Sequence, residues 1–326
     1  MDMINEQLQK KIDRSIRLLQ SVQKRYDGEI EVAYSGGKDS DVILQLAKEA
    51  GIKYRAIHKS TTIDPPGTIA HVKEMGVEIL RPKISFFDLV AKKGLPSRFY
   101  RFCCEQLKEY KVCNKAIIGV RKAESSKRAA IYKEPTECRY YGEKKEENHV
   151  EAIYPILEWT DEDVRNFIID RKLKLAPIYY NSGGQIDVSK RLGCMCCPLA
   201  SQRKRIAYFK EKPRMARCYL RAGKRFWDTH PDSHVQDRYA DIYEWFTRNV
   251  FFLREKDWQE ANNSLFGKPN WKEFLEVRLT EQSCAYFIPI CIGAVKYVTS
   301  EPFVNVVVSL TRLAVGMRVH KSLPSA

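Results

Sequence analysis

The stretch EVAYSGGKDSDVILQLAKEAG, residues 31–51, decides the fold of this chain. It runs from an apolar segment through two glycines and a lysine into a helix-like pattern. The glycines at 36 and 37 allow a sharp turn and let backbone N–H groups approach a ligand closely. The helix that follows points the positive end of its dipole at this turn, where Lys38 adds a formal charge. The segment therefore predicts an anion site at a strand-to-helix junction.

The side chains of this loop narrow the choice of anion. The hydroxyls of Ser35 and Ser40 are neutral donors, whereas Asp39 suits a Mg²⁺ ion carried by a nucleotide better than it suits a bare phosphate. The Walker pattern G-x-x-x-x-G-K-[ST] does not occur in this stretch. An ordinary turn is the alternative, since glycine and serine are common in turns. The flanking strand and helix favour a nucleotide site.

Outward from this loop, strand-like and helix-like segments alternate. We expect strands at 29–34, 53–58, 77–80 and 115–120. We expect helices at about 41–50, 67–76, 86–94, 104–112 and 159–172, the last capped by Thr160, with a solvated polar excursion at 139–149. Such alternation predicts an α/β fold with a parallel sheet covered on both faces. Ligands of such sheets bind beyond the carboxyl ends of the strands, where the glycine loop falls.

Four regions divide the 326 residues, a length that fits about two domains. Residues 1–28 are expected to form an amphipathic leader helix, with apolar residues at helical spacing: Ile4, Leu8, Ile12, Ile16, Leu19 and Val22. Residues 29–200 form the predicted nucleotide-binding domain. Residues 201–279 form a basic, aromatic-rich helical extension, and 280–326 are an apolar tail to which we assign no role.

The amino-acid composition limits the classes of binding partner and indicates the cellular compartment. The formal charge of +15 favours polyanionic or phosphate-bearing partners, with a generally basic surface as the alternative. Hydrophobic content of 44% and charged content of 30% fit a globular protein. Ten cysteines without a recognisable signal peptide indicate thiols or metal ligands and a cytoplasmic location. The apolar runs of the tail are shorter than the roughly 20 residues of a membrane helix, so no membrane partner is expected.

Six motifs follow one another along the chain: SGGKDS (35–40), TTIDPP (61–66), RFCCEQLK (101–108), IIGVRKAESSKRA (117–129), YPILEWTDEDVRNFI (154–168) and RLGCMCCP (191–198). By these motifs, residues 29–200 resemble the phosphoadenosine-phosphosulfate (PAPS) reductase family of the adenine-nucleotide α-hydrolase superfamily. The resemblance implies a Rossmann-like domain whose pyrophosphate loop binds ATP, or a sulfonucleotide such as adenylyl sulfate or PAPS. It also implies attack at the α-phosphate with release of pyrophosphate.

The resemblance assigns roles to particular residues. It gives the nucleotide a set of binding residues, namely Ser35, Gly36, Gly37, Lys38, Asp39, Ser40, Asp64 and Gly119. Asp64 is expected near the ribose or adenine, and Gly119 near the phosphates. The expected catalytic residues are Lys38, Asp39, Arg121 and Arg128. A guanidinium fork matches phosphate or sulfate oxygens, although two surface arginines are the plainer alternative.

The cysteines form a constellation of their own. Cys103-Cys104 and the C-x-x-C pair Cys194 and Cys197 provide four soft thiolates, which suit an iron–sulfur cluster or tetrahedral zinc. Incidental buried thiols are the alternative, because free cysteine is among the most buried residue types. The arrangement resembles the [4Fe–4S] site of assimilatory adenylylsulfate reductases, which favours iron–sulfur over zinc. Cys196 remains open as a substitute for Cys197.

Two features depart from the reductases proper. The glycine loop of the reductases proper resembles a variant that lacks this Gly-Gly-Lys-Asp-Ser combination. Their mobile nucleophilic cysteine lies in a Glu-Cys-Gly-(Ile or Leu)-His motif, and this motif does not occur in residues 1–326.

Residues 201–225 carry ten Lys or Arg and one acidic residue, interleaved with Tyr208, Phe209 and Tyr219. This pattern favours nucleic-acid binding, with a solvated helix that presents core aromatics as the alternative.

Three functions follow for the chain. The first is an ATP-dependent transferase that adenylates its substrate, releases pyrophosphate and moves sulfur from a donor protein, with a nucleic acid as the candidate acceptor. The second is a reductase of adenylyl sulfate or PAPS that releases sulfite. The third is a non-catalytic nucleotide- or nucleic-acid-binding component of a multi-protein system.

Overall fold

The computed structural model describes residues 6–141, 147–201, 204–205, 208–209 and 212–251. By internal contacts the chain divides into two compact units, residues 1–201 with 219–231 and residues 202–218 with 232–326. Most of the second unit, including the whole expected tail at 280–326, lies outside the described residues. We describe each unit by itself.

The first unit holds one six-stranded sheet within the described residues. Its strands are β1 (Ile30–Ala33), β2 (Tyr54–Lys59), β3 (Glu78–Leu80), β4 (Lys115–Ile117), β5 (Thr136–Tyr140) and β6 (His149–Ile153). Their order across the sheet is β3-β2-β1-β4-β6-β5. All neighbouring pairs are parallel except β5 and β6, which are antiparallel. The predicted α/β fold with a mostly parallel sheet is therefore confirmed.

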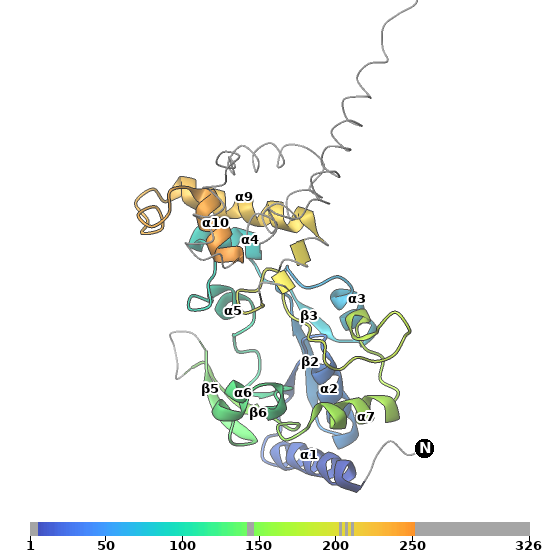
Figure 1. Cartoon of the computed structure of the whole chain (residues 1–326). Helices are drawn as coiled ribbons and strands as arrows, with labels where there is room; N and C mark the ends of the chain where they lie inside the picture. Colours follow the sequence, from blue (N-terminus) through green and yellow to red (C-terminus); the bar gives the residue numbers. More distant parts are fainter. Residues whose placement is uncertain (1–5, 142–146, 202–203, 206–207, 210–211, 252–326) are drawn as a thin grey trace, which may run out of the picture. The chain divides into compact units, whose positions relative to one another are not determined.

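Helices connect and cover these strands. They are α1 (Glu6–Lys24), α2 (Lys38–Ala50), α3 (Thr68–Glu74), α4 (Phe86–Lys93), α5 (Phe102–Leu107), α6 (Ser126–Ile131), α7 (Asp161–Asp170), α9 (Pro213–Thr229) and α10 (Ile242–Phe251), with short 3₁₀ turns η1 (Lys122–Glu124) and η2 (Pro177–Tyr179). Helix α2 packs against β1, α1 and α7 (Figure 1). Helix α1 lies within the expected leader segment 1–28, and its Leu8, Ile12, Leu19 and Val22 face the core.

Helix α2 starts earlier than its sequence pattern indicated. We expected a start near Asp41, but the helix begins at Lys38 with Gly37 as its N-cap at φ −94° and ψ 159°. Gly37 has no side chain with which to mark a cap, so the usual Ser or Asp signal is missing. As a result, Lys38, Asp39 and Ser40 form the first helical turn, and their backbone N–H groups lie at the positive end of the helix.

Two other expectations were wrong in detail. The helix expected at 104–112 spans only Phe102–Leu107, because the next residues turn to other partners; the Tyr110 carbonyl accepts a hydrogen bond of 2.7 Å from Lys59 Nζ. The polar excursion expected at 139–149 includes parts of the β5–β6 hairpin, with residues 142–146 outside the description. Strand β5 is polar because it is an edge strand, and only one of its neighbours is a strand.

In the second unit, described residues near 205 pack against α10. The guanidinium of Arg205, 2% exposed, donates hydrogen bonds to the carbonyls of Asn249 and Val250 at 3.0 and 2.6 Å. Trp245 and Phe246 of the same helix are buried. Arg205 therefore closes the end of a helix, which presents free carbonyls in its last turn.

Candidate functional site

The glycine loop lies between the carboxyl end of β1 and the start of α2. Gly36 has φ 78°, and a Cβ atom added to it would lie 2.9 Å from Cγ2 of Thr68 on α3, so both its backbone angle and its surroundings require glycine. The Ser35 hydroxyl accepts a hydrogen bond from the Gly37 N–H at 3.3 Å. Ser35, Gly37, Lys38, Asp39 and Ser40 line a pocket of about 170 Å³. The loop thus surrounds a space that suits phosphate groups.

A buried charge network holds the first turn of α2. Lys38 Nζ lies 3.0 Å from one carboxylate oxygen of Asp39, and Arg121 Nε lies 2.7 Å from the other. The guanidinium of Arg121 also contacts Asp161 at 2.7 Å and the Trp159 carbonyl at 3.3 Å. Because Arg121 is fully buried behind Asp39, it positions the loop, in contrast to the expectation that it would face the phosphates.

Gly119 allows β4 to approach this network. A Cβ atom at Gly119 would lie 2.9 Å from the backbone carbonyl oxygen of Asp39. Gly119 also lines the 170 Å³ pocket, across from the loop. The contact therefore explains why a residue without a side chain is needed after β4, and it places Gly119 at the pocket that the glycine loop lines.

A second arginine cluster lies at the same pocket. Glu124, whose side chain is 7% exposed, forms ion pairs with Arg128 and, at 2.6 Å, with Arg191. Burial and the neighbouring charge of Arg191 lower the pKa of Arg128. Arg191 and Glu124 line the pocket, and Arg128 is connected to it by its ion pair with Glu124. Sequence reasoning missed Arg191, although it is the first residue of the RLGCMCCP motif.

Tyr179 is another pocket residue that the sequence did not reveal. Its hydroxyl accepts hydrogen bonds from the backbone N–H groups of Lys38 and Leu192, the latter at 3.2 Å. Burial outweighs these hydrogen bonds and raises the pKa of Tyr179 to about 12, so the phenol stays neutral. Tyr179 therefore joins the start of α2 to the segment that carries Arg191, and the only sequence signal was its place in an apolar run.

Beneath the loop, a buried polar cluster joins α2 to α3. The Tyr34 hydroxyl donates a hydrogen bond to Asp41 and lies 2.9 Å from Nε2 of His71, which is itself 2.9 Å from Asp41. Burial raises the pKa of Asp41 against the opposing effect of His71. This cluster fixes the residue just before Ser35, so the floor of the loop is held by polar contacts as well as by packing.

A second pocket, of about 180 Å³, adjoins the first. The two share Ala33, Ser35 and Ile118 as lining residues, so they meet at the end of β1. The second pocket is also lined by His58, whose Nδ1 lies 3.0 Å from the Tyr34 carbonyl oxygen. Strand β5, which the sequence did not predict, brings Arg139 to the same pocket. The two pockets together offer adjoining space for a polyphosphate and a nucleoside.

Asp64 contributes to this second pocket through His58. One oxygen of Asp64 lies 3.7 Å from Nε2 of His58, and the carboxylate accepts hydrogen bonds from Ser60 and from the backbone N–H and hydroxyl of Thr61. Burial opposes ionisation, but His58 and Thr61 outweigh it and lower the pKa of Asp64 to about 2. Asp64 therefore orients the ring that faces the predicted nucleoside space.

The four predicted cysteines come together from two distant segments. Cys103 and Cys104 begin α5, and their charges interact with those of Cys194 and Cys197. A hydrogen bond from Cys103 to Cys104 raises the pKa of the Cys103 thiol and lowers that of Cys104, which the charges of Arg101 and Lys108 lower further. Cys104 is thus the more acidic thiol of the vicinal pair.

The segment after Arg191 is folded around Cys196. Cys196 is 1% exposed and has a left-handed backbone at φ 56°. The N–H of Met195 donates to the Ile63 carbonyl at 2.9 Å, which ties this segment to the loop after β2. The thiols of Cys194 and Cys197 are half-buried on either side of this turn. The thiol cluster therefore lies at the carboxyl edge of the sheet, beside Asp64.

The four cysteines and Asp39 are the predicted metal ligands. Within the described residues, no group of three or more His, Cys, Asp or Glu side chains is arranged to hold a metal ion. Three of the four sulfurs take part in other interactions in this structure, since Cys103 donates to Cys104 and Lys108 donates to Cys194. The carboxylate of Asp39, expected to bind Mg²⁺, is likewise occupied by Lys38 and Arg121. The iron–sulfur, zinc and magnesium assignments therefore remain predictions.

The basic segment 201–225 departs from its expected role. Three aromatic side chains proposed as stacking groups, Tyr208, Phe209 and Tyr219, are at most 9% exposed. Arg205 is also buried, as described above. Five basic residues of α9 remain at least partly exposed: Arg214, Arg217, Arg221, Lys224 and Arg225. The aromatic side chains of this segment therefore belong to the core, its basic face is accessible, and nucleic-acid binding through it remains a prediction. None of the helices in the described residues has the length and apolar character that a membrane crossing requires.

The chain is similar to proteins from several sources. It is 28% identical over 235 residues to an uncharacterized protein of Methanocaldococcus jannaschii, covering 68% of this chain and 54% of that protein. A second uncharacterized protein of the same organism is 26% identical over 200 residues, which cover 56% of this chain and 39% of that protein. The chain thus spans about half or less of the length of these curated relatives.

Two solved structures are also similar. One is the phosphoadenylyl-sulfate (PAPS) reductase from Candida auris in a phosphate complex, with a TM-score of 0.36, 16% identity and coverage of 56% of this chain and 93% of that chain. The other is the U34-tRNA thiolase NcsA from Methanococcus maripaludis with its [4Fe-4S] cluster, with a TM-score of 0.37, 15% identity and coverage of 77% and 92%.

A family model gives the firmest comparison. The model of the phosphoadenosine phosphosulfate reductase domain matches residues 29–200, the same range that the motifs delimit. This range holds the glycine loop, Gly119, the arginines and the four cysteines of the site. Because the match covers more than half of the 326 residues, the chain belongs to the phosphoadenosine phosphosulfate reductase domain family.

Proposed function

We propose that this protein binds ATP at the glycine loop, transfers the adenylyl group to an oxygen of its substrate, and then replaces that oxygen with sulfur. The observation that carries the proposal is the pair of adjoining pockets at the end of β1. One is lined by the loop, Lys38 and Arg191, and the other by His58 and Arg139. A polyphosphate and a nucleoside need these two environments side by side.

The first step joins the substrate to the nucleotide. A substrate oxygen attacks the α-phosphorus of ATP and forms a P–O bond, while the bond from this phosphorus to the bridging oxygen of the β-phosphate breaks. The electron pair of the broken bond leaves with pyrophosphate. The chain's contribution is electrostatic, because Lys38 and Arg191 lie where negative charge develops on the leaving group. Mg²⁺ bound to the nucleotide supplies further charge when present.

The second step introduces sulfur. A hydrosulfide sulfur, supplied by a donor protein, attacks the activated carbon and forms a C–S bond while the C–O bond breaks and its electron pair leaves with AMP. The sulfur gives up its proton to solvent or to a neighbouring base, so the step needs no outside oxidant or reductant. The lowered pKa of Cys104 makes it the more readily ionised thiol of the vicinal pair.

The experiment that tests the proposal measures pyrophosphate release from ATP by purified protein. Lys38→Ala should abolish release, because it removes the cation of the loop. Lys48→Ala is a matched control, since Lys48 lies exposed in the last turn of the same helix. Equal pyrophosphate release by the two variants would contradict the proposal. Tight ATP binding with no release under any substrate would instead support a non-catalytic nucleotide-binding component.

The family match favours one further candidate. A reductase of adenylyl sulfate or PAPS would use the same loop for the nucleotide and a thiolate, with Cys104 as the most acidic thiol of the vicinal pair, to attack sulfur. The thiolate would form a sulfur–sulfur bond, and AMP or its 3′-phosphorylated form would leave. A second thiol would then release sulfite. Incubation with adenylyl sulfate and a dithiol separates the two candidates, since the reductase yields sulfite and the transferase yields pyrophosphate from ATP.

A further inference from the structure

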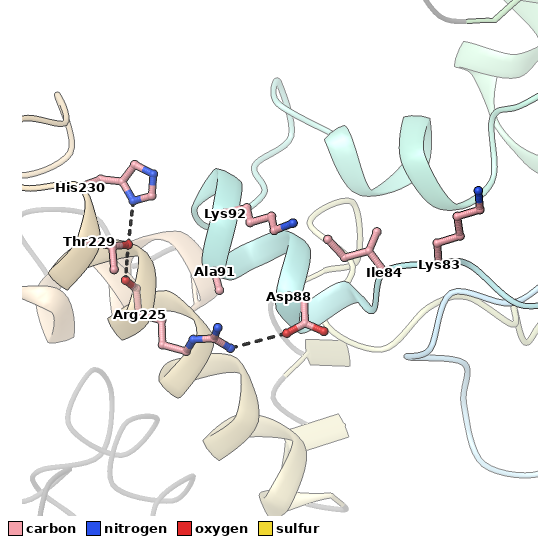
Figure 2. A pocket seen from close by; sticks show the side chains of 8 residues that line it. All are labelled: Lys83, Ile84, Asp88, Ala91, Lys92, Arg225, Thr229 and His230. Atoms are coloured by element: carbon pink, nitrogen blue, oxygen red, sulfur yellow. Dashed lines mark hydrogen bonds and ion pairs between the residues drawn. The ribbon is translucent and has the colours of Figure 1, made fainter.

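A cavity of about 520 Å³ in the first unit takes no part in the site described above (Figure 2). It lies between α4 and the C-terminal end of α9, and we name it the α4–α9 pocket. Its lining includes the cationic side chains of Lys83, Lys92 and Arg225, the ring of His230, and the single carboxylate of Asp88. All five residues are exposed. The pocket is therefore an open, basic cavity.

The walls of the pocket are held by aromatic packing. The ring of Tyr219 lies 5.4 Å from that of Phe86 and 6.3 Å from that of Phe87, so the buried face of α9 packs on α4. His230 stacks on the buried ring of Phe226 at 4.3 Å and 14°. These contacts fix the two helices, while the charged groups at their surface stay accessible. The pocket is thus formed before any ligand arrives.

The charges of the pocket are only loosely neutralised. Arg225 and Asp88 approach to 3.5 Å, and their side chains are 69% and 53% exposed (Figure 2). Such an exposed pair contributes little to stability, and an incoming anion can replace Asp88 at small cost. Lys83 and Lys92 add two further cations to the same cavity. This chemistry selects phosphoryl groups, which carry charge and several acceptor oxygens.

The pocket and the glycine loop lie at the same edge of the sheet. Strands β1, β2 and β3 are adjacent and parallel, so the segments that follow their carboxyl ends share one edge. The glycine loop follows β1, and Lys83 follows β3. The segment after β2 holds Ile63, which is hydrogen-bonded to Met195 beside the cysteines. The segments that carry Lys83, the contact to the cysteine segment and the glycine loop therefore follow three adjacent strands, which are spaced by about 5 Å.

An aromatic loop next to α4 indicates which phosphate ligand fits. After α4 ends, four consecutive residues are exposed: Arg98, Phe99, Tyr100 and Arg101. Phe99 is 100% exposed and Tyr100 is 52% exposed, and the loop leads directly into Cys103. Exposed aromatic rings between arginines are suited to stacked bases beside a phosphate backbone. The exposed Arg221 and Lys224 extend the basic surface along α9.

From these observations we infer that the α4–α9 pocket binds backbone phosphates of a single-stranded nucleic acid whose bases stack on the 98–101 loop. The inference names the acceptor class of the proposed sulfur transfer, and in that respect it rests on the proposed function. The shared chemistry is a phosphoryl group, which could come from a free phosphate compound or from a strand. The aromatic loop and the extended basic surface favour the strand.

The test measures binding of a fluorescent single-stranded RNA of about 20 nucleotides by anisotropy, without ATP, because this length exceeds the usual 4–16-nucleotide site. Reversal of two charges, K92E with R225E, should weaken binding at least tenfold and reduce the salt slope by about 1.4, given about 0.7 per lost phosphate contact. The control K10E with R17E makes the same change of net charge on the exposed surface of α1. Equal losses in the two double variants would overturn the inference.

Two further variants sharpen the result. Asp88→Asn should tighten RNA binding severalfold, because it removes the carboxylate that competes with phosphate for Arg225. Phe99→Ala should weaken binding about fivefold or more without changing the salt slope, since stacking is not ionic. Binding of inorganic tripolyphosphate is measured for the same double variant. If K92E with R225E abolishes tripolyphosphate binding but leaves RNA binding unaffected, the ligand is a small phosphate compound and the inference is wrong.

The design separates this inference from the proposed function. RNA binding is measured without ATP, so a protein that releases no pyrophosphate can still show the pocket-dependent binding. Conversely, pyrophosphate release that depends on Lys38 can persist in a protein whose RNA binding ignores the pocket. Circular dichroism and thermal unfolding of each variant verify that the exposed substitutions leave the fold intact.

Discussion

The glycine loop and the α4–α9 pocket both gather positive charge, but they hold it in opposite ways. In the loop, the side chains of Lys38 and Arg121 are 2% and 1% exposed, and each has an ion pair with Asp39 of 3.0 Å or less. In the pocket, the pair of Arg225 and Asp88 is mostly exposed and 3.5 Å long. Buried pairs are costly to break, whereas exposed pairs are worth little. The buried ion pairs of the loop therefore hold its side chains in place, whereas the exposed ion pair of the pocket can be replaced by contacts to a ligand.

The largest expected effect comes from breaking the buried network. Arg121→Gln leaves the carboxylate of Asp39 without its strongest partner in a buried setting, so the free energy of unfolding should fall by about 3 kcal/mol or more. Urea unfolding measures this change. Arg225→Gln is the control, and its cost should stay below about 0.5 kcal/mol because its ion pair is exposed. Similar costs for the two variants would remove the contrast between the regions.

The close approach of β4 to α2 gives the next effect. Gly119→Ala places a Cβ atom 2.9 Å from the Asp39 carbonyl oxygen, and relief of that contact should cost about 1–3 kcal/mol and lower pyrophosphate release. Gly193→Ala is the matched control, because an added Cβ there meets open space among the described residues. The comparison would weaken if both alanine variants kept full stability and activity.

Asp64 provides a test by pH. Its pKa of about 2 lies below the ordinary value of 3.8, so the folded protein holds this carboxylate ionised more strongly than the unfolded chain does. The resulting stabilisation, about 2 kcal/mol, is complete above the unfolded pKa and is lost as the pH falls from about 4 towards 2. In Asp64→Asn, the decline of stability across this window should be shallower than in the parent protein. Parallel curves would show that Asp64 contributes nothing.

The smallest effect concerns a single hydroxyl. Tyr179→Phe removes the acceptor for two backbone N–H groups at the loop, and should cost about 1 kcal/mol and weaken ATP binding about fivefold. Tyr180→Phe serves as the control, because its hydroxyl accepts from the Leu175 N–H at 3.1 Å and Tyr180 does not line the loop pocket. Calorimetric titration with ATP should separate the variants, and equal ATP affinities would argue against a role for Tyr179 in the loop.

Much of the fold could be predicted from local patterns. Strands β1 to β4 and helices α2, α3, α4 and α7 carry regular apolar spacing, and their order implies a parallel sheet. Strand β5 was missed because an edge strand keeps polar residues on both faces. The start of α2 was misplaced because its cap is a glycine. In both cases the local sequence lacks the signal that the surrounding structure supplies.

The site could be predicted less completely. The loop, Gly119 and the cysteines stand out in the sequence, but Arg191, Tyr179 and His58 gain their roles only when distant segments meet. The aromatic residues near Tyr219 show the reverse case. The spacing of Tyr219, Leu220 and Phe226 on α9 already indicates an apolar helix face. For predicting that these side chains are buried, this periodicity is a better guide than the basic charge around them.

The carboxylate of Asp39 influences which anions can bind at the loop. Because it already neutralises Lys38, it acts as an internal substitute for the ligand, and an incoming anion must compete with it. A singly or doubly charged ion such as chloride or sulfate gains too little to displace a buried partner, whereas a triphosphate offers several charges at once. Under the proposed function, the loop therefore favours a triphosphate over abundant inorganic ions such as chloride and sulfate.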